Sequence, residues 1–203
     1  MTLDALNIAI TWPEIFLLAM ACVILVVDVF IEDKRRNLTY LLTQLTLLLT
    51  AVLITMSEAD QRALAFNDMF VQDQLADTLK LFILAITFVI FVYSRDYLRD
   101  RDIFKGEFYV LGLFGVLGMM IMVSASHFLS LYLGLELLSL CLYAMVAFHR
   151  DEYSCSEAAM KYFVLGALAS GMLLYGVSML YGVTGTLSIA EVATEIDVTT
   201  ALQ

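Results

Sequence analysis

Polar side chains recur along one apolar stretch of the chain, between Phe128 and Phe148. They supply three hydroxyl groups and one carboxyl group, from Tyr132, Glu136, Ser139 and Tyr143. At about 100° per residue in a helix, their offsets place them within an arc of roughly 60° on one face. We call this face the polar stripe. It must lie against protein or water, because lipid offers such groups no hydrogen bonds.

Glu136 is the member of the polar stripe whose chemistry is most informative. It lies roughly 12 Å along the apolar stretch at about 1.5 Å per residue, which is near the midplane of a hydrocarbon core about 30 Å thick. A charge at that depth costs about 3 to more than 10 kcal/mol, so acids there are rare and usually functional. Glu136 is therefore a candidate for carrying a proton across the membrane. The alternative is a structural acid that is hydrogen-bonded to a neighbouring helix.

Lys161 is the second candidate for proton transfer. Glu157 precedes it by four residues, which is the favourable order for an ion pair on a helix. One interpretation is a lysine that reaches the membrane interface and is neutralised by this glutamate. The other is a buried lysine that passes protons. The sequence leaves both open.

The remaining reactive residue types predict no further chemistry. Asp28 is expected to anchor the end of its helix next to Lys34 and Arg35. His127 and His149 lack the paired arrangement of haem ligands, so neither a metal nor a haem site is expected. The cysteines, which form no CxxC pair and predict no disulfide framework, are Cys22, Cys141 and Cys155.

The composition indicates an integral membrane protein. The chain has 203 residues, of which 62% are hydrophobic and 16% charged, whereas a soluble domain is nearer half apolar and a quarter charged. The net charge of −10 argues against a nucleic-acid-binding protein, which needs a basic face.

One domain over residues 1–203, with six membrane-spanning helices, is predicted to position the candidate groups. Helices are required because a backbone in lipid must satisfy its own hydrogen bonds, and no alternating strand pattern is present. A capping box at Ser188–Glu191 predicts a short surface helix at about 188–196. The predicted spans are 15–31, 38–56, 78–93, 108–123, 128–148 and 157–181.

Small residues within the spans predict close helix packing and no chemistry. They are Thr39, Thr43, Thr46, Thr50, Gly112, Gly115, Gly118, Gly166, Ala169, Ser170 and Gly176.

Loop charges predict the orientation. The loops on one side are basic, whereas those on the other are mostly acidic and offer Arg62, with Lys80 at the membrane edge. The positive-inside rule places the basic loops in the cytoplasm and both chain ends outside. The residues of the basic loops are Lys34, Arg35, Arg36, Arg95, Arg99, Arg101, Lys105 and Arg150.

Several segments together resemble a known family. They are Gly106–Tyr109, Phe128–Leu140, Ala147–Phe148, Glu157–Phe163, Leu165–Leu168 and Leu174–Gly176. The chain resembles the subunit N family of bacterial NADH-quinone oxidoreductase, respiratory complex I. These are antiporter-like membrane subunits related to the Mrp cation/proton antiporters.

The resemblance implies a fold and roles for two residues. The fold is an all-α polytopic membrane protein, of which this chain is the N-terminal part: six helices of a fourteen-helix antiporter-like fold. Glu136 matches a glutamate of the fifth helix that is proposed to transfer protons, and Lys161 matches a lysine of the sixth helix on the same hydrophilic axis. The family's further lysines, on helices seven, eight and twelve, have no counterpart here, so the chain alone is not expected to complete a proton path.

The resemblance also implies partners and a location. We expect a multi-pass protein of the bacterial inner membrane, in contact with lipid and with other membrane subunits of complex I, and with no nucleic acid. No cofactor is expected in this chain, because NADH, FMN, iron–sulfur clusters and quinone are used by other subunits. The leading hypothesis is a proton-translocating subunit that performs no redox chemistry itself. The alternatives are a subunit of a Mrp-type cation/proton antiporter and a truncated structural membrane module.

Overall fold

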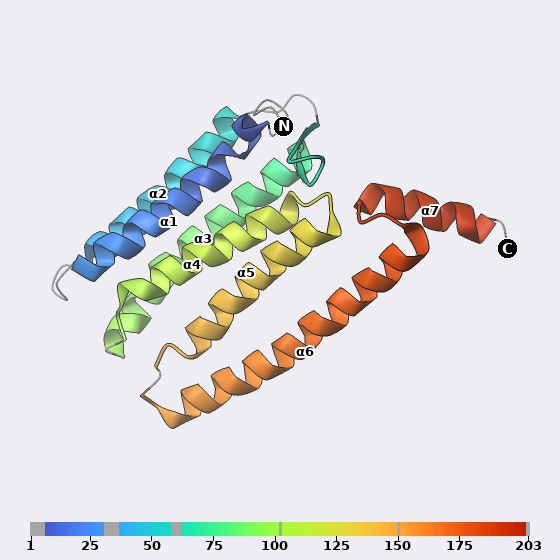
Figure 1. Ribbon diagram of the computed structural model, residues 1–203. Coiled ribbons are helices and arrows are strands. Elements are labelled where there is room, and N and C mark those ends of the chain that lie inside the picture. The colour runs from blue at the N-terminus through green and yellow to red at the C-terminus, as the bar shows by residue number, and fades with distance from the viewer. Residues whose placement is uncertain (1–6, 31–36, 58–61, 102, 150, 202–203) are drawn as a thin grey trace.

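The computed structural model describes residues 7–30, 37–57, 62–101, 103–149 and 151–201. Six of its helices are long and apolar enough to cross a membrane, which confirms the predicted number of spans. A seventh helix follows at one end of the six (Figure 1). The helices are η2 (Ile8–Thr11, a 3-10 turn), α1 (Trp12–Phe30), α2 (Asn37–Met56), α3 (Gln74–Asp100), α4 (Gly106–Val123), α5 (Phe128–Val146), α6 (Tyr153–Thr184) and α7 (Ile189–Ala201).

Most helices extend beyond the apolar run that predicted them. α3 covers Gln74–Asp100 instead of 78–93, and α6 covers Tyr153–Thr184 instead of 157–181. The reason is that an apolar run marks only the hydrocarbon layer, whereas a helix continues through the polar layer on either side. α5 differs in the other direction, since it ends at Val146 and the chain then turns.

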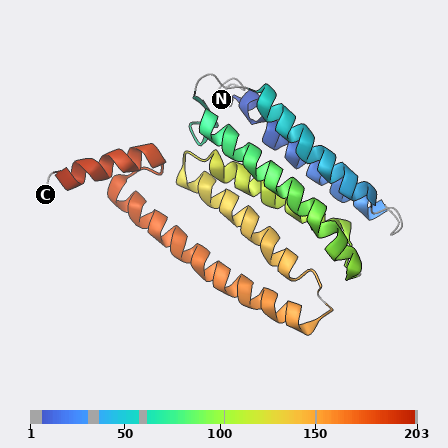
Figure 2. The same ribbon diagram turned by 180° about the vertical axis from the view of Figure 1, so that it is seen from behind.

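The helices form a packed group of five with a sixth at the edge. α4 packs against α1, α2, α3 and α5, so it lies at the centre of the bundle (Figures 1 and 2). α6 packs mainly on α5, and none of its most apolar 18-residue window is buried. The structure therefore leaves most of the surface of α6 open to lipid or to another protein.

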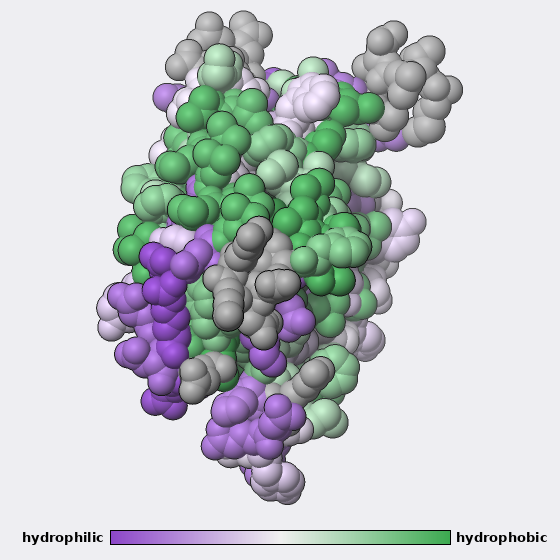
Figure 3. Space-filling view, turned by 90° about the vertical axis from the view of Figure 1, so that its left-hand side faces the viewer, coloured by the Kyte–Doolittle hydropathy of each residue, from purple (hydrophilic) through white to green (hydrophobic). Residues whose placement is uncertain are grey.

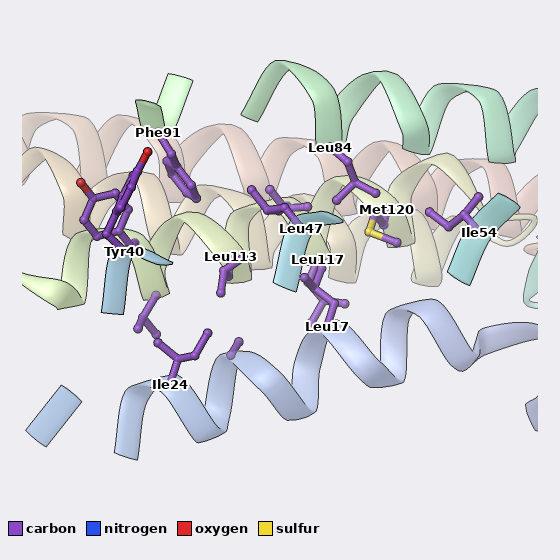
Figure 4. Close-up of a cluster of buried hydrophobic side chains, with 14 of the residues drawn as sticks. Leu17, Ile24, Tyr40, Leu47, Ile54, Leu84, Phe91, Leu113, Leu117 and Met120 are labelled. Carbon is purple, nitrogen blue, oxygen red and sulfur yellow. The ribbon is translucent and has the colours of Figure 1, made fainter. Parts of the chain in front are cut away.

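The core lies between the first four spanning helices. Figure 4 shows side chains from α1, α2, α3 and α4 pointing toward one another, among them Leu17, Leu47, Leu84 and Leu113. The threonines predicted to allow close packing on α2 are fully buried. The hydroxyls of Thr43, Thr46 and Thr50 donate to backbone carbonyls of the preceding turn, as Thr43 does to Thr39 at 2.8 Å, and that of Thr39 donates to the carboxylate of Asp28. Close packing of α2 is thus achieved without unsatisfied hydroxyls.

A β-hairpin that the sequence analysis did not predict lies between α2 and α3. Strands β1 (Ala63–Ala65) and β2 (Phe70–Gln72) pair antiparallel. The turn between them has positive φ at Phe66, Asn67 and Asp68. The amide of Val71 donates to the carbonyl of Ser124 at 2.8 Å, which ties the hairpin to the turn between α4 and α5.

The same end of the bundle carries the connection from α6 to α7. Gly185 ends α6 with φ of 71°, and the amide of Ile189 donates to the carbonyl of Ser126 at 3.0 Å. The capping box was predicted between Ser188 and Glu191, but both residues bond to Thr186 instead. The carboxylate of Glu191 accepts a hydrogen bond from the hydroxyl of Thr186, and the amide of Ser188 donates to the same hydroxyl at 3.2 Å. Thr186 therefore links the turn before α7 to Glu191 in the first turn of that helix.

The opposite end carries the connections from α3 to α4 and from α5 to α6. Figure 3 views the molecule from this side, where hydrophilic residues gather below a broad hydrophobic surface. Both connections lie at the edge of the apolar helical layer, as a membrane-spanning bundle requires.

Candidate functional site

Glu136 lies on α5 with an oxygen in contact with a hydroxyl of α6. The hydroxyl of Ser170 donates to Glu136 Oε1. The hydroxyls of Tyr132 and Ser170 lie 3.0 Å apart. We call these three residues the intramembrane cluster. Glu136 is the ninth of the 19 residues of α5, so it lies about 12 Å from the start of that helix and about 15 Å from its end.

The hydrogen bonds of the intramembrane cluster have a direction. A serine hydroxyl has one proton to donate, and that of Ser170 is directed to Glu136. Tyr132 must then be the donor to Ser170. The result is a chain from Tyr132 through Ser170 to the carboxyl group, in which each hydroxyl can both accept and donate a proton.

A cavity adjoins this chain. It has a volume of about 440 Å³ and lies between α5 and α6, where Tyr132, Met172 and Gly176 are among its lining residues. Apart from Tyr132, its lining residues are apolar or glycine, so Tyr132 is the polar residue that borders it. The chain of hydroxyls therefore reaches from Glu136 toward a space between the two helices.

The other two members of the polar stripe do not join the cluster. Tyr143 packs edge-on against Tyr162 and Phe163 of α6, with ring centroids 4.8 and 5.6 Å away. Its hydroxyl occupies the place that a Cβ on Gly166 would take. Ser139 is half-buried and has no hydrogen bond among the described contacts. The stripe thus divides into a hydrogen-bonded half at Glu136 and an aromatic half at Tyr143.

Lys161 lies on α6 nine residues before Ser170, roughly 13 Å along the helix axis. Its Nζ is 2.6 Å from Glu157 Oε1, in an ion pair whose side chains are 70% and 45% exposed. The structure therefore contains the helical ion pair that the sequence predicted, and it does not bring Lys161 into contact with Glu136. The rings of Tyr143 and Tyr162 lie between the two along the helix pair.

Contact between two glycines positions α5 against α4. A Cβ on Gly118 would lie 2.7 Å from the carbonyl oxygen of Gly134, and a Cβ on Gly134 would lie 2.7 Å from the carbonyl oxygen of Gly118. Only glycine permits this approach of two helix backbones. Gly134 precedes Glu136 by two residues, so the contact fixes the position of the carboxyl group relative to the core.

Ser170 is the functional candidate that sequence reasoning missed. It was grouped with the small residues of α6 that allow close packing, a reading that its neighbour Gly166 supports. The signal that identifies it is the hydroxyl itself, because a serine inside an apolar helix needs a partner. That partner, Glu136, lies 34 residues away in the chain, and only the packing of α5 on α6 reveals it.

A second polar site lies in the bundle, between α1 and α3. Lys80 is 2% exposed and its Nζ is 2.6 Å from Glu14 Oε1. Its position at the membrane edge stays a prediction, and its side chain turns inward to this ion pair. Glu14 also lines an apolar cavity of about 410 Å³ together with Phe66 and Leu133. The sequence analysis did not connect these two charges.

Asp28 is held by polar contacts within the bundle. Its Oδ1 accepts a 2.6 Å hydrogen bond from the hydroxyl of Thr39, and its carboxylate fills the space that a Cβ on Gly106 would need. The expected neighbours Lys34 and Arg35 lie outside the described residues.

One group of side chains has the composition of a metal site. His149, Glu152 and Cys155 lie at the turn from α5 to α6, and each places one ligand atom within 4.8 Å of those of the other two. All three cysteines of the chain have free thiols.

Comparisons with known proteins agree with the fold. A family model described as NADH:quinone oxidoreductase/Mrp antiporter, TM, matches residues 125–202, which include the whole intramembrane cluster. The NADH-quinone oxidoreductase subunit N of Thioalkalivibrio sulfidiphilus is 62% identical over 181 residues, which cover 89% of this chain. That of Alkalilimnicola ehrlichii is 54% identical over 187 residues, which cover 92%. The chain belongs to the subunit N family.

The chain spans 38% of the length of each of these subunit N relatives. The fold resembles a chain of respiratory complex I from Thermus thermophilus with bound aureothin, with a TM-score of 0.72 and 28% identity over 87% of this chain and 38% of that one. It also resembles a chain of the membrane-bound sulfane sulfur reductase, an archaeal respiratory membrane complex, with a TM-score of 0.72 over 92% of this chain. At 21% identity, the second likeness concerns the fold alone.

Proposed function

We propose that the chain is part of a proton-translocating membrane subunit of an NADH:quinone oxidoreductase, and that Glu136 binds and releases the proton. The observation that carries the proposal is the intramembrane cluster: one carboxyl group in the middle of α5, hydrogen-bonded to Ser170, which is bonded in turn to Tyr132. A purely structural acid needs one partner, whereas a group that exchanges protons needs a connected chain of donors and acceptors.

The cluster supplies one part of a proton path. A proton that enters from the cavity beside Tyr132 reaches Glu136 by two transfers between neighbouring oxygens, through the hydroxyl of Ser170. Lys161 lies on the other side of the aromatic pair Tyr143–Tyr162 and serves in this proposal as the next proton-binding group on α6. The interval of roughly 13 Å along α6 requires water or further side chains, which the exposed face of α6 leaves room for.

The chain's role within a larger enzyme follows from the same residues. In this proposal the described residues move protons, while NADH, FMN, iron–sulfur clusters and quinone are handled by other subunits. The exposed side of α6 is where further membrane-embedded protein would complete the path. We place the basic end of α3, which carries Arg99 and the following Arg101, in the cytoplasm. Both chain ends then lie on the outer side of a bacterial inner membrane, in agreement with the positive-inside rule.

The competing function is that of a Mrp-type cation/proton antiporter subunit. The matching family model names both groups of proteins. The identity of 62% to a protein named as subunit N of NADH-quinone oxidoreductase favours the first function.

The test is Glu136→Gln in the complete subunit, assembled in its enzyme in inverted membrane vesicles. The variant keeps the size and the acceptor oxygen of the side chain and removes the proton-binding group. NADH-driven acidification of the vesicles should fall, while electron transfer from NADH to ferricyanide continues at the wild-type rate. Glu195→Gln, on the exposed face of α7, is the matched control and should leave both rates unchanged.

Two outcomes would contradict the proposal. If Glu136→Gln lowers the amount of assembled enzyme and both activities equally, the residue is structural. If the vesicles carry no NADH-driven acidification but exchange Na⁺ for protons, the antiporter function is correct instead.

A further inference from the structure

The turn between α5 and α6 brings together three side chains that the proposed function does not use. His149 Nδ1 lies 3.4 Å from Glu152 Oε2, and Cys155 Sγ lies 3.8 Å from the same oxygen. The three ligand atoms all lie within 4.8 Å of one another. We call these residues the corner cluster. It lies at the opposite end of α5 from the hairpin (Figure 1).

Local backbone structure sets this spacing. The amide of Glu152 donates to the carbonyl of His149 at 3.0 Å, and the amide of Cys155 donates to the carbonyl of Glu152 at 3.1 Å. Side chains three residues apart eclipse one another when the backbone makes such bonds between residues i and i+3. Two successive turns of this kind therefore place residues 149, 152 and 155 in a row on one side of the chain.

The distances in the corner cluster agree with those between ligands of one zinc ion. Zinc binds histidine nitrogen at about 2.0–2.1 Å, carboxylate oxygen at about 2.0–2.2 Å and thiolate sulfur at about 2.3 Å, in a tetrahedron. Two ligands of one tetrahedral ion are then separated by about 3.3–3.7 Å. The separation of 3.4 Å from Glu152 Oε2 lies in this range, that of 3.8 Å slightly exceeds it, and the histidine nitrogen and the cysteine sulfur lie within 4.8 Å of each other.

We infer that His149, Glu152 and Cys155 bind a Zn²⁺ ion, with water as its fourth ligand. The ligand set favours a transition metal such as zinc: imidazole and thiolate suit zinc, whereas Mg²⁺ and Ca²⁺ require oxygen ligands. The carboxylate is not used at the helix end, because Glu152 occupies the N-cap position of α6 without a side-chain capping bond. The side chains of His149 and Glu152 are 48% and 57% exposed, so an ion can enter from the aqueous side.

The bound ion would join two helices. His149 follows the end of α5 by three residues, and Cys155 belongs to the first turn of α6. A metal bridge between them would fix the corner from which α6 carries Ser170 to Glu136. Binding of an ion to the folded chain only would also raise its thermal stability.

The sequence analysis predicted no metal because it considered only paired histidines within the membrane. The available signal was the spacing His-x-x-Glu-x-x-Cys at residues 149, 152 and 155. This spacing brings the three side chains together only where the backbone makes a turn every three residues. The apolar pattern of the flanking spans does not predict such turns.

Titration of the reduced, metal-free chain in nanodiscs with Co²⁺, a spectroscopic substitute for Zn²⁺, tests the inference. We expect saturation at one equivalent, visible bands of a tetrahedral ion and a near-ultraviolet band from charge transfer between thiolate and metal. Added Zn²⁺ should bleach all of them. Cys155→Ser should abolish the charge-transfer band, whereas Cys155→His should keep the visible bands and lose only charge transfer, because it replaces sulfur by nitrogen.

Matched controls distinguish this site from other cysteines and histidines of the chain. Cys22→Ser removes an exposed thiol of α1, and His127→Asn removes the other histidine; both should retain the full Co²⁺ spectrum. The inference is overturned if wild-type chain shows no saturable binding, if charge transfer survives in Cys155→Ser, or if His149→Asn binds Co²⁺ as tightly as wild type. All these readouts are independent of proton pumping.

Discussion

Lys80 Nζ lies 2.6 Å from Glu14 Oε1 and thereby joins α3 to α1 inside the bundle. The side chains are only 2% and 7% exposed. Asp77 lies 4.0 Å from the same ammonium group, and the ring of Phe70 in the hairpin lies 4.9 Å from it. One lysine therefore connects two spanning helices with the hairpin that follows α2.

Loss of one charge of this pair should destabilise the fold strongly. Breaking a buried ion pair on one side costs about 3–5 kcal/mol, because the remaining charge is left without a partner. Lys80→Met should accordingly lower the midpoint of SDS-induced unfolding, followed by circular dichroism in mixed micelles. The double variant Glu14→Leu, Lys80→Met should recover most of the loss, since an apolar pair of similar volume needs no compensation.

The control for this prediction is Arg62→Met, which removes an exposed cation near the hairpin. It should change the midpoint little, as exposed charges contribute about 0–1 kcal/mol. A single Lys80→Met variant as stable as wild type would contradict the role assigned to the pair.

Ser170→Ala tests the hydrogen-bonded chain to Glu136. The substitution removes the hydroxyl that donates to Glu136 and accepts from Tyr132. A hydrogen bond of this kind contributes about 0.5–1.5 kcal/mol, which corresponds to a roughly 2- to 12-fold slower proton translocation if the chain carries the protons. NADH-driven acidification of vesicles is the measurement. Ser170→Thr, which keeps a hydroxyl, should restore most of the rate, and the exposed Ser178→Ala on the same helix should have no effect.

Features of the fold that depend on interactions between residues close in the chain could be predicted from the sequence. Contacts between residues far apart in the chain could not. The spans follow from composition and from hydrogen bonds within a helix, which are local, so six helices could be predicted. Glu136 was identifiable from depth alone, as an acid in the middle of an apolar run. Its partner Ser170 was not, because the contact joins residues 34 apart on two helices whose mutual rotation no local pattern records.

The same limit explains what the sequence did not reveal. Lys80 follows a loop at the start of an apolar run, a place typical of an interfacial lysine, and its buried ion pair depends on the position of Glu14 on another helix. The β-hairpin depends on three successive residues with positive φ, none of them glycine. Asn67 and Asp68 are residue types that adopt positive φ, whereas Phe66 is not, so the composition of the turn predicts only part of this conformation.

Lys161→Arg distinguishes the two interpretations of that lysine. Arginine preserves the positive charge and the ion pair with Glu157, but it does not release its proton in proteins. If Lys161 transfers protons, the variant assembles normally and pumps poorly. Glu157→Gln provides the comparison: an exposed helical ion pair contributes about 0.3–0.5 kcal/mol, so its loss should hardly change stability. Normal pumping by Lys161→Arg in the assembled enzyme would show that the lysine is an interfacial charge only.

The backbone contact between α4 and α5 yields the last prediction. A Cβ on Gly118 would lie 2.7 Å from a backbone oxygen of α5, which cannot move aside as a flexible side chain does. Gly118→Ala should therefore separate the helices and destabilise the fold by about 1–3 kcal/mol. Gly171→Ala, on α6, has nothing within 4 Å of the added carbon and should be neutral or stabilising by up to about 1 kcal/mol, from helix propensity alone. Unfolding midpoints in SDS measure both. Equal midpoints for the two variants would mean that α5 is not held at this distance, and the depth of Glu136 would then need another cause.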